Sequence, residues 1–568
     1  MQRDPFLAGM RLARPLVAVG VALALADASV VTLALPQLIV ELDTTVEGVA
    51  AVLAVYTLVL AVALIPAERL RRLVGSTRLG VWGFIVFAAA GAGCGLVNSL
   101  TPLLLLRGAQ ALGAAAGLMA GFAFLTVEER GRERLWTAAA VLGAAVGPAL
   151  GGILTELFDW RAIFLVQAPV GILSAAALAV TGSAGVTIDG PLAAAEQEKP
   201  AARKRIQLGA AAALGLVSAA LSAVLFLLVL LLVSGWSLSP LEAAFVVAIV
   251  PAAALVGMRI RGEPRVLATA GCALVGAGVV TLAFLPSASV AWTVLPQVLA
   301  GLGMGLALTS LIGPMLPERT PAQTASLLAI RHAGVTLALL LVAPITAAQI
   351  DDSVAETRER GAALVLDAEL GPLDKIELAS AVTADLDPVD PRETLRSSLD
   401  AAAGSVGDDP ETAAVYDDLT RRADETLVAG INDAFAAAFL VTGALGLLGA
   451  LAVFPWRGGR AARISLVVAG SALALAACQA LLARGAEPEA VAILNPCEGR
   501  DLPGTGGIGG VVQDVALAGL DRAACEFGSS REELAIALVD EDAATTYEAE
   551  HGVDPRSIED LARGALGF

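Results

Sequence analysis

The chain has 568 residues, of which 57% are hydrophobic and 16% are charged, and its formal net charge at pH 7 is −18. A soluble chain would be about a quarter charged, so this composition excludes an ordinary soluble protein. Apolar stretches of about twenty residues recur along the chain, which is the length that a helix needs to cross a bilayer. We therefore expect an all-α polytopic membrane protein. The acidic balance argues against nucleic acid as a partner.

The first part of the chain holds six apolar stretches. We expect the corresponding spans near 16–35, 48–67, 79–98, 101–124, 135–156 and 162–181. Residues 1–181 would thus form an N-terminal six-helix half, and residues 182–206, with clustered Lys and Arg, would form a cytoplasmic linker. The basic N-terminus leads into the first span without a cleavage site, so we expect that helix to be retained.

Seven further spans follow the linker. We expect them near 207–234, 240–259, 266–286, 290–314, 324–348, 431–455 and 464–483. Residues 207–457 would form a C-terminal six-helix half, interrupted by an acidic insertion at 349–430. A thirteenth span within 458–484 is additional to the two halves. Residues 485–568 form an acidic tail.

The short loops indicate the orientation, because Lys and Arg gather in cytoplasmic loops. Every second loop of the expected bundle is rich in Arg, whereas loops such as VELDTTVEG and SGWSLSP contain neither Lys nor Arg. This pattern predicts a multi-pass protein of the plasma membrane with a cytoplasmic N-terminus. The insertion is then extracytoplasmic. The tail is extracytoplasmic as well, because thirteen spans are an odd number.

The tail contains Cys497 and Cys525, the only cysteines expected outside the spans. Because the compartment outside the cell is oxidising, we expect a disulfide between them. Two cysteines without neighbouring histidines fall short of a zinc site, so no metal site is expected. Ser530 and Glu533 have the spacing of a helix-capping box, which predicts a small helical domain. A solvated spacer is the alternative.

Two ionisable side chains lie well inside expected spans, where a charge is costly and points to function. Asp27 lies roughly 13 Å below the outer end of its span and Arg107 roughly 9 Å, at 1.5 Å per residue. At comparable depth, the two can pair or can compete for a proton and a cationic substrate. Gln110 shares the helix face of Arg107. The alternative is a static ion pair that only fixes helix packing.

The stretch VLGAAVGPALGG in the fifth span combines glycines with a proline. Small residues four apart let two membrane helices approach closely, and a proline bends a span. A bent and closely packed helix suggests a moving joint. The candidate packing and gating residues are Gly143, Gly147, Pro148, Gly151 and Gly152.

Four stretches together resemble the major facilitator superfamily, and within it the drug:proton antiporters that usually have fourteen helices. They are LADASVVTLALP in the first span, RGAQALGAAAG in the fourth, GAAVGPALGG in the fifth and DWRAIFLVQAPVG at the start of the sixth. The resemblance covers roughly 10–350 and 430–457. It implies two six-helix halves that rock around a central cavity. Asp27, Arg107 and Gln110 occupy motif positions, and the fifth-helix motif, typical of exporters, would pack against the opposite half.

The loop after the second span departs from the family pattern Gly-x-Leu-x-Asp-Arg-x-Gly-Arg. It reads ERLRRLVGSTR, with Arg72 at the position of the aspartate and only Gly75 retained. Because that aspartate helps to latch the inner gate in the family, the resemblance implies an unusual latch here. Thr32 stands where relatives often have asparagine. The two additional central helices of the fourteen-helix type are missing.

We therefore expect a proton-coupled exporter of drug-like or amphipathic small molecules, embedded in membrane lipids and driven by the proton gradient without a cofactor. Aromatic residues make up only 4% of the chain and offer few cation–π sites, so a lipid or envelope precursor is an alternative substrate. A second alternative is a transport-incompetent anchor whose extracytoplasmic domains bind an envelope partner. The chain has no nucleotide-binding loop and no zinc signature, so we expect no catalytic residue and no enzyme.

Overall fold

The structure of the protein is a computed structural model. It describes residues 5–126, 133–183, 207–316, 320–371, 374–375, 378, 390–403, 410–503 and 507–557. Apart from its first two residues, the expected linker lies outside these described residues. The described residues form helices joined by turns, and their only β-type pairing is an isolated bridge between Ile312 and Leu316. The all-α fold class predicted from composition is confirmed.

The N-terminal half contains eight helices among the described residues. They are α1 (Pro5–Thr32), α2 (Leu35–Glu41), α3 (Val46–Val74), α4 (Ser76–Cys94), α5 (Leu100–Thr126), α6 (Glu133–Leu157), α7 (Trp160–Leu165) and α8 (Gln167–Ser183). Thr45 begins α3 by accepting a hydrogen bond from the backbone N–H of Gly48, and Asp159 begins α7 in the same way. These side chains satisfy backbone donors that a helix start leaves open. The expected sixth span is therefore divided between α7 and α8.

The C-terminal half also consists of helices in the described residues. Its helices are α10 (Leu208–Leu230), the π-helix η1 (Leu231–Gly235), α11 (Pro240–Val247), α12 (Ile249–Gly257), α13 (Pro264–Thr281), α14 (Val290–Leu311), α15 (Pro321–Asp367) and α18 (Pro410–Val453). A reciprocal capping box between Ser239 and Glu242 begins α11. Helix α19 (Gly459–Arg484) follows and packs mainly on α13.

Twelve helices of the described residues are long and apolar enough to cross a membrane. They include α19, whose passage through the bilayer as an additional span stays a prediction. Helix α6 is not among the twelve, and it contributes the shorter apolar segment Val146–Leu157. The polytopic character expected from the sequence is confirmed.

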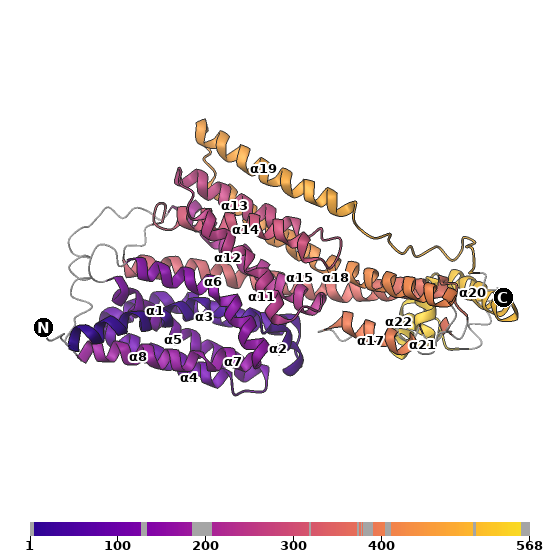
Figure 1. The fold of residues 1–568 in the computed structure, drawn as a ribbon, viewed down its shortest axis with the longest axis horizontal. Helices are drawn as coiled ribbons and strands as arrows, with labels where there is room; N and C mark the ends of the chain where they lie inside the picture. The colour runs from indigo at the N-terminus through magenta and orange to yellow at the C-terminus, as the bar shows by residue number, and fades with distance from the viewer. Residues whose placement is uncertain are drawn as a thin grey trace.

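The two halves lie side by side in Figure 1, indigo to violet for the first and magenta to orange for the second. Helix α3 packs along α15, and α6 packs against α11. The hydroxyls of Thr57 on α3 and Thr336 on α15 are buried and lie 2.9 Å apart. A single hydrophobic cluster contains residues of both halves, among them Leu33, Trp160 and Leu228. Through this shared core, the two halves pack against each other at one end of the bundle.

Helices α15 and α18 extend far beyond that end of the bundle, which we call the distal end (Figure 1). They have 47 and 44 residues, whereas the sequence analysis expected the spans to stop near residue 348 and to resume near 431. Their extensions pack together, since Leu364 and Val365 share a hydrophobic cluster with Leu419 and Leu427. Apolar residues at helical spacing therefore continue both helices beyond the distal end.

The described residues of the tail contain three helices, which dock on this extension. They are α20 (Gly507–Phe527), α21 (Arg531–Val539) and α22 (Glu541–His551), and α17 (Pro391–Ala403) lies beside them (Figure 1). Arg531 is fully buried and donates to Asp367 of α15 at 2.6 Å. Arg358 of α15 donates to Asp540 at 3.1 Å. The insertion and the tail therefore lie at the same end of the bundle.

The start of α21 differs in part from the expected capping box. Ser530 accepts a hydrogen bond from the backbone N–H of Glu533 at 2.9 Å, as predicted. The carboxylate of Glu533 instead pairs with His551 of α22 at 2.9 Å. The side chain that would complete the box therefore joins α21 to α22.

Candidate functional site

Asp27 and Arg107 form a buried ion pair between α1 and α5. Arg107 Nη2 donates to Asp27 Oδ2 at 2.6 Å, and both side chains are 0% exposed. Their similar depth in the sequence analysis agrees with this geometry. Breaking such a buried pair by removing one partner costs about 3–5 kcal/mol, because the remaining charge is left uncompensated. The pair thus holds α1 firmly against α5.

Two glutamines convert the pair into a closed ring of four side chains. Arg107 Nη1 donates to Gln110 Oε1 at 2.7 Å, and Gln110 Nε2 donates to Gln167 Oε1 at 2.8 Å. Gln167 Nε2 then donates back to Asp27 Oδ1 at 3.0 Å. All four residues are 0% exposed. This ring, which we call the polar ring, joins helices α1, α5 and α8.

Arg107 has further contacts with α3 and α7. Its Nε donates to the backbone carbonyl of Val52 on α3 at 3.2 Å. The guanidinium carbon lies 4.4 Å from the ring centroid of Tyr56 and 5.4 Å from that of Phe164. Tyr56 in turn donates to the carbonyl of Ala24 at 2.8 Å. Cation–π contacts and a hydrogen bond thus fix the arginine in one orientation.

Gln167 is the member of the ring that the sequence analysis did not single out. It lies within the sixth-helix motif DWRAIFLVQAPVG, at the first residue of α8. The sequence feature that could have identified it is a long polar amide within an apolar span. A buried amide needs hydrogen-bond partners.

The glycines of α6 contact two different partners. A Cβ added to Gly143 would lie 2.4 Å from the carbonyl oxygen of Ala22, and one added to Gly151 would lie 2.3 Å from that of Val30. A Cβ on Gly147 would lie 2.1 Å from Ser29 Oγ. These three glycines therefore pack on α1 of the same half, whereas the sequence analysis placed the whole seam against the opposite half.

Gly152 makes the contact between halves. A Cβ there would lie 2.5 Å from Ala244 Cβ and 2.8 Å from the carbonyl oxygen of Pro240, both on α11. Pro148 lies buried inside α6, four residues earlier. It lacks the N–H of a normal helix residue, so it weakens α6 within the stretch that packs on α1. The consecutive residues Gly151 and Gly152 thus contact α1 and α11, respectively.

The α3–α4 turn has an unusual ion pair. Arg71 is buried and donates to both carboxylate oxygens of Glu68, at 2.8 and 3.0 Å, and to Ser76 Oγ at 3.1 Å. Arg72, which replaces the family's aspartate, donates to Glu68 at 3.1 Å. The carboxylate in this turn therefore comes from Glu68, one helical turn before the position that the motif predicts.

Cys497 and Cys525 are joined by a disulfide in the structure. It connects the segment after α19 to helix α20. Of the remaining cysteines, Cys94 and Cys272 are buried, and Cys478 is exposed on α19.

Comparisons with known proteins agree with this arrangement. The family model of the Major Facilitator Superfamily matches residues 17–343. The multidrug resistance protein Stp of Mycobacterium tuberculosis (strain H37Rv) is 37% identical over 153 residues, 26% of this chain and 28% of Stp. The methylenomycin A resistance protein of Streptomyces coelicolor is 31% identical over 165 residues, 28% of this chain and 35% of that protein.

The riboflavin transporter RibZ of Clostridioides difficile is 29% identical over 164 residues, 28% of this chain and 36% of RibZ. The chain thus matches only 28% to 36% of the length of these three relatives. Among solved structures, a bacterial homologue of the human lysosomal transporter Spinster, inward-facing and unoccupied, has a TM-score of 0.52 at 16% identity. That likeness covers 80% of this chain and 99% of the other, and it concerns the fold.

Proposed function

The chain belongs to the Major Facilitator Superfamily, and we propose that it is a proton-coupled exporter of drug-like or amphipathic small molecules. Relatives whose names refer to multidrug or methylenomycin resistance support export of this substrate class. A plasma-membrane location with a cytoplasmic N-terminus and an extracytoplasmic C-terminus belongs to the same proposal. It rests on the distribution of Lys and Arg in the short loops.

The polar ring is the observation that carries the proposal. Asp27 is a carboxylate without solvent contact, and its two partners are the donors of Arg107 and Gln167. A proton on Asp27 removes the negative charge that compensates Arg107. The ring then contains an unpaired guanidinium in a low-dielectric interior, which favours rearrangement of α1, α5 and α8.

The cost of opening the ion pair and the free energy that one proton supplies are of similar size. Opening a buried ion pair costs about 3–5 kcal/mol. A proton that moves down one pH unit releases about 1.4 kcal/mol, and about 100 mV of membrane potential adds about 2.3 kcal/mol. A single proton can therefore offset most of the cost of opening the pair.

The glycine contacts connect the ring to the interface between the halves. Asp27 lies on α1 between Ala26 and Ser29, which both contact the Gly147 region of α6. One turn further along α6, Gly152 contacts α11 of the other half. A shift of α1 that follows protonation would thus be passed through α6 to α11. In an alternating-access cycle, this coupling would change which side of the membrane is open.

Vesicle transport tests the proposal. In everted vesicles containing the full chain, a panel of amphipathic compounds should release protons in the wild type, followed with a pH-sensitive dye. Asp27→Asn should abolish this proton movement while the protein remains inserted. Glu47→Gln is the matched control, because Glu47 is exposed at the start of α3. Undiminished proton-linked transport by Asp27→Asn would remove Asp27 from the mechanism.

A further inference from the structure

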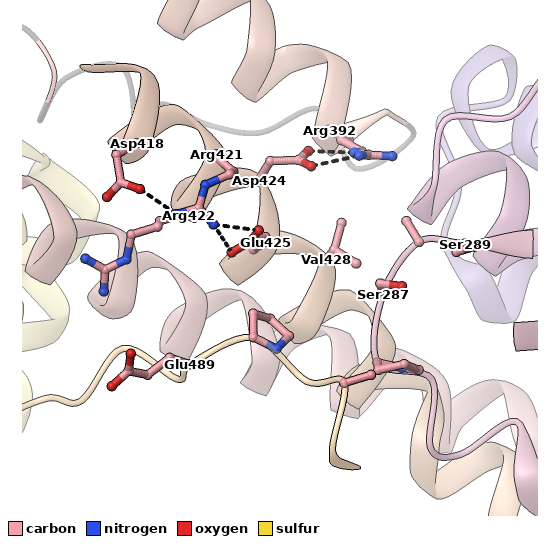
Figure 2. A pocket seen from close by; sticks show the side chains of 14 residues that line it. Ser287, Ser289, Arg392, Asp418, Arg421, Arg422, Asp424, Glu425, Val428 and Glu489 are labelled. Carbon is pink, nitrogen blue, oxygen red and sulfur yellow. Dashed lines mark hydrogen bonds and ion pairs between the residues drawn. The ribbon is translucent and has the colours of Figure 1, made fainter. Parts of the chain in front are cut away.

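A cavity of about 730 Å³ lies at the distal end of the C-terminal half, away from the polar ring. Its walls come from four segments that are distant in the sequence. These are the loop 286–289 between α13 and α14, Arg392 of α17, the extended part of α18, and residues 486–489 directly after α19. Figure 2 shows the charged side chains of α18 on one side and the loop residues Ser287 and Ser289 on the other. Its volume lies within the usual range for small-molecule sites.

The cavity lies where helices long and apolar enough to cross a membrane begin or end. Helix α13 ends at Thr281, α14 begins at Val290 and α19 ends at Arg484. Both the loop and the segment after α19 thus follow directly on membrane-spanning lengths of helix. A bilayer has a polar layer on each side of its hydrocarbon core, and this layer is where such span ends lie.

The wall of the cavity is amphipathic. The loop and the segment after α19 contribute prolines and alanines, and α18 adds Val428. The rest of α18 contributes charged groups, and most of these are paired. Arg392 donates to both carboxylate oxygens of Asp424, at 2.6 and 2.7 Å. Arg421 donates to both oxygens of Glu425, at 2.8 and 3.0 Å, and also to Asp418.

Two charged side chains in the wall are unpaired among the described residues. Within the part of the chain that the structure describes, the side chains of Arg422 and Glu489 make no hydrogen bond or ion pair. Arg422 extends from α18, and Glu489 comes from the segment after α19 (Figure 2). The cavity therefore offers one free guanidinium and one free carboxylate from different walls. A bound molecule with both signs of charge can satisfy them together, whereas a simple anion would leave Glu489 unpaired.

We propose that this cavity binds the head group of a zwitterionic phospholipid. Arg422 pairs with the phosphate, for which a guanidinium is well suited, and Glu489 pairs with the ammonium group. The upper part of the acyl chains lies along Val428, Pro286 of the loop and Pro488 of the segment after α19. This inference concerns a site outside the polar ring, and it does not rest on the proposed transport function.

The neighbouring helix α19 supports a lipid as the occupant. Only 22% of its most apolar 18-residue segment is buried in the protein. Exposed apolar side chains along it include Leu473, Leu475, Leu481 and Leu482. These side chains require lipid around α19 up to the residue where the cavity begins. A phospholipid there has its chains in the bilayer and its head group in the cavity.

Lipid binding to the purified full chain tests the proposal, with native mass spectrometry to count bound lipids and thermal unfolding as a second readout. The probes are phosphatidylethanolamine, phosphatidylglycerol and diacylglycerol. The wild type should prefer phosphatidylethanolamine. Arg422→Gln and Glu489→Gln should each lower its affinity about tenfold, because each removes one charge-assisted hydrogen bond.

Two matched controls keep the test specific. Glu487→Gln changes a carboxylate two residues from Glu489 that does not line the cavity, and Arg396→Gln changes an exposed arginine of α17. Both should retain the wild-type affinity. Equal phosphatidylethanolamine binding by the wild type, Arg422→Gln and Glu489→Gln would overturn the site. A preference for phosphatidylglycerol that Glu489→Gln leaves unchanged would overturn the zwitterionic assignment.

A soluble compound distinguishes a lipid from a transported zwitterion with the same chemistry. Glycerophosphoethanolamine carries the phosphate and the ammonium group without acyl chains. The proposal expects it to bind far more weakly than phosphatidylethanolamine, because it lacks the apolar contacts. Binding of equal strength, lost in Arg422→Gln, would overturn the lipid assignment in favour of a soluble ligand.

Discussion

The side-chain amide of Gln167 donates to the carboxylate of Asp27 at 3.0 Å, although 140 residues separate the two in the chain. This hydrogen bond closes the polar ring and gives Asp27 a partner on each oxygen. Because the ring is closed, the position of α8 depends on the charge of Asp27 as directly as that of α5 does. The candidate proton site thus joins three helices and not only two.

Opening the ring at Gln167 should destabilise the N-terminal half. Gln167→Leu leaves Gln110 Nε2 and one oxygen of Asp27 without a partner, which costs about 1–3 kcal/mol. We expect a lower midpoint of thermal unfolding and a shifted pH profile of transport. Gln207→Leu, at the exposed start of α10, should change neither. An unaltered pH profile in Gln167→Leu would mean that this amide has only a packing role.

Arg107 and Asp27 should show strong energetic coupling. Arg107→Leu leaves a buried carboxylate alone and should cost about 3–5 kcal/mol, whereas adding Asp27→Asn should restore much of that loss. The double variant should fold but transport nothing. Thermal unfolding of the four proteins of this double-mutant cycle measures the coupling. Additive losses would contradict a direct pair.

The α1–α6 contact should tolerate no added methyl group at Gly151. A Cβ there meets the backbone oxygen of Val30 at 2.3 Å, and a backbone atom cannot rotate away. Gly151→Ala should therefore cost about 1–3 kcal/mol through overpacking and reduce efflux. Gly470→Ala, in α19, is the control, because no atom lies within 4 Å of its added Cβ. Efflux at the wild-type level from Gly151→Ala would contradict close packing as a requirement for transport.

Docking of the tail should weaken as the pH rises. Burial and the carboxylates of Glu533 and Glu532 raise the pKa of Glu359 from its ordinary value of 4.5. The docked state therefore binds this proton more tightly than the undocked state, so stability falls with rising pH above that value. The backbone N–H of Ala543 lowers the pKa of Asp540, and this effect acts below its ordinary value of 3.8, outside that window.

Glu359→Gln tests this pH dependence. The variant should dock more firmly than the wild type at about pH 7.5 and equally well at about pH 4, below the ordinary pKa of the carboxyl group. Hydrogen exchange of α21 in the full chain measures docking. Glu369→Gln, an exposed carboxylate just after the end of α15, is the control. A pH dependence of docking unchanged by Glu359→Gln would assign it to another group.

Chemical labelling of the cysteines tests on which side of the membrane the tail lies. In intact cells, a membrane-impermeant thiol reagent should label Cys497 and Cys525 only after reduction, since they are joined in the structure. Cys94 and Cys272 are buried and should stay unlabelled. Mass spectrometry of tryptic peptides identifies the labelled sites. Labelling of the reduced pair only after the cells are opened would contradict an extracytoplasmic tail.

The sequence predicted the parts of the fold that depend on local composition. Apolar stretches of sufficient length located the spans, and depth along those spans brought Asp27 and Arg107 to one level. The partner of the α6 glycines depends on how α6 is rotated about its axis, and a family motif does not contain that angle. For this reason the contact of Gly143, Gly147 and Gly151 with α1 was not foreseen.

The extension was missed for a different reason. Hydropathy shows where apolar residues end, and it ends a span near residue 348. The helix itself continues, because Ala, Glu and Arg favour helix and Leu364 finds a partner in Leu419 of α18. That contact joins residues far apart in the sequence. Long-range packing therefore decided where α15 ends.

Helix α15 is a continuous helical connection between the bundle and the tail. It contacts α3 of the other half through Thr336 and carries α21 near its far end. At 1.5 Å per residue, the part after residue 348 is roughly 28 Å long, so a tilt of about 10° would move its tip about 5 Å. A small tilt of α15 would thus become a larger displacement of the tail. Two fluorophores, one on the tail and one at the start of α3, could follow the proposed rocking of the halves in real time without a probe in the proposed substrate path.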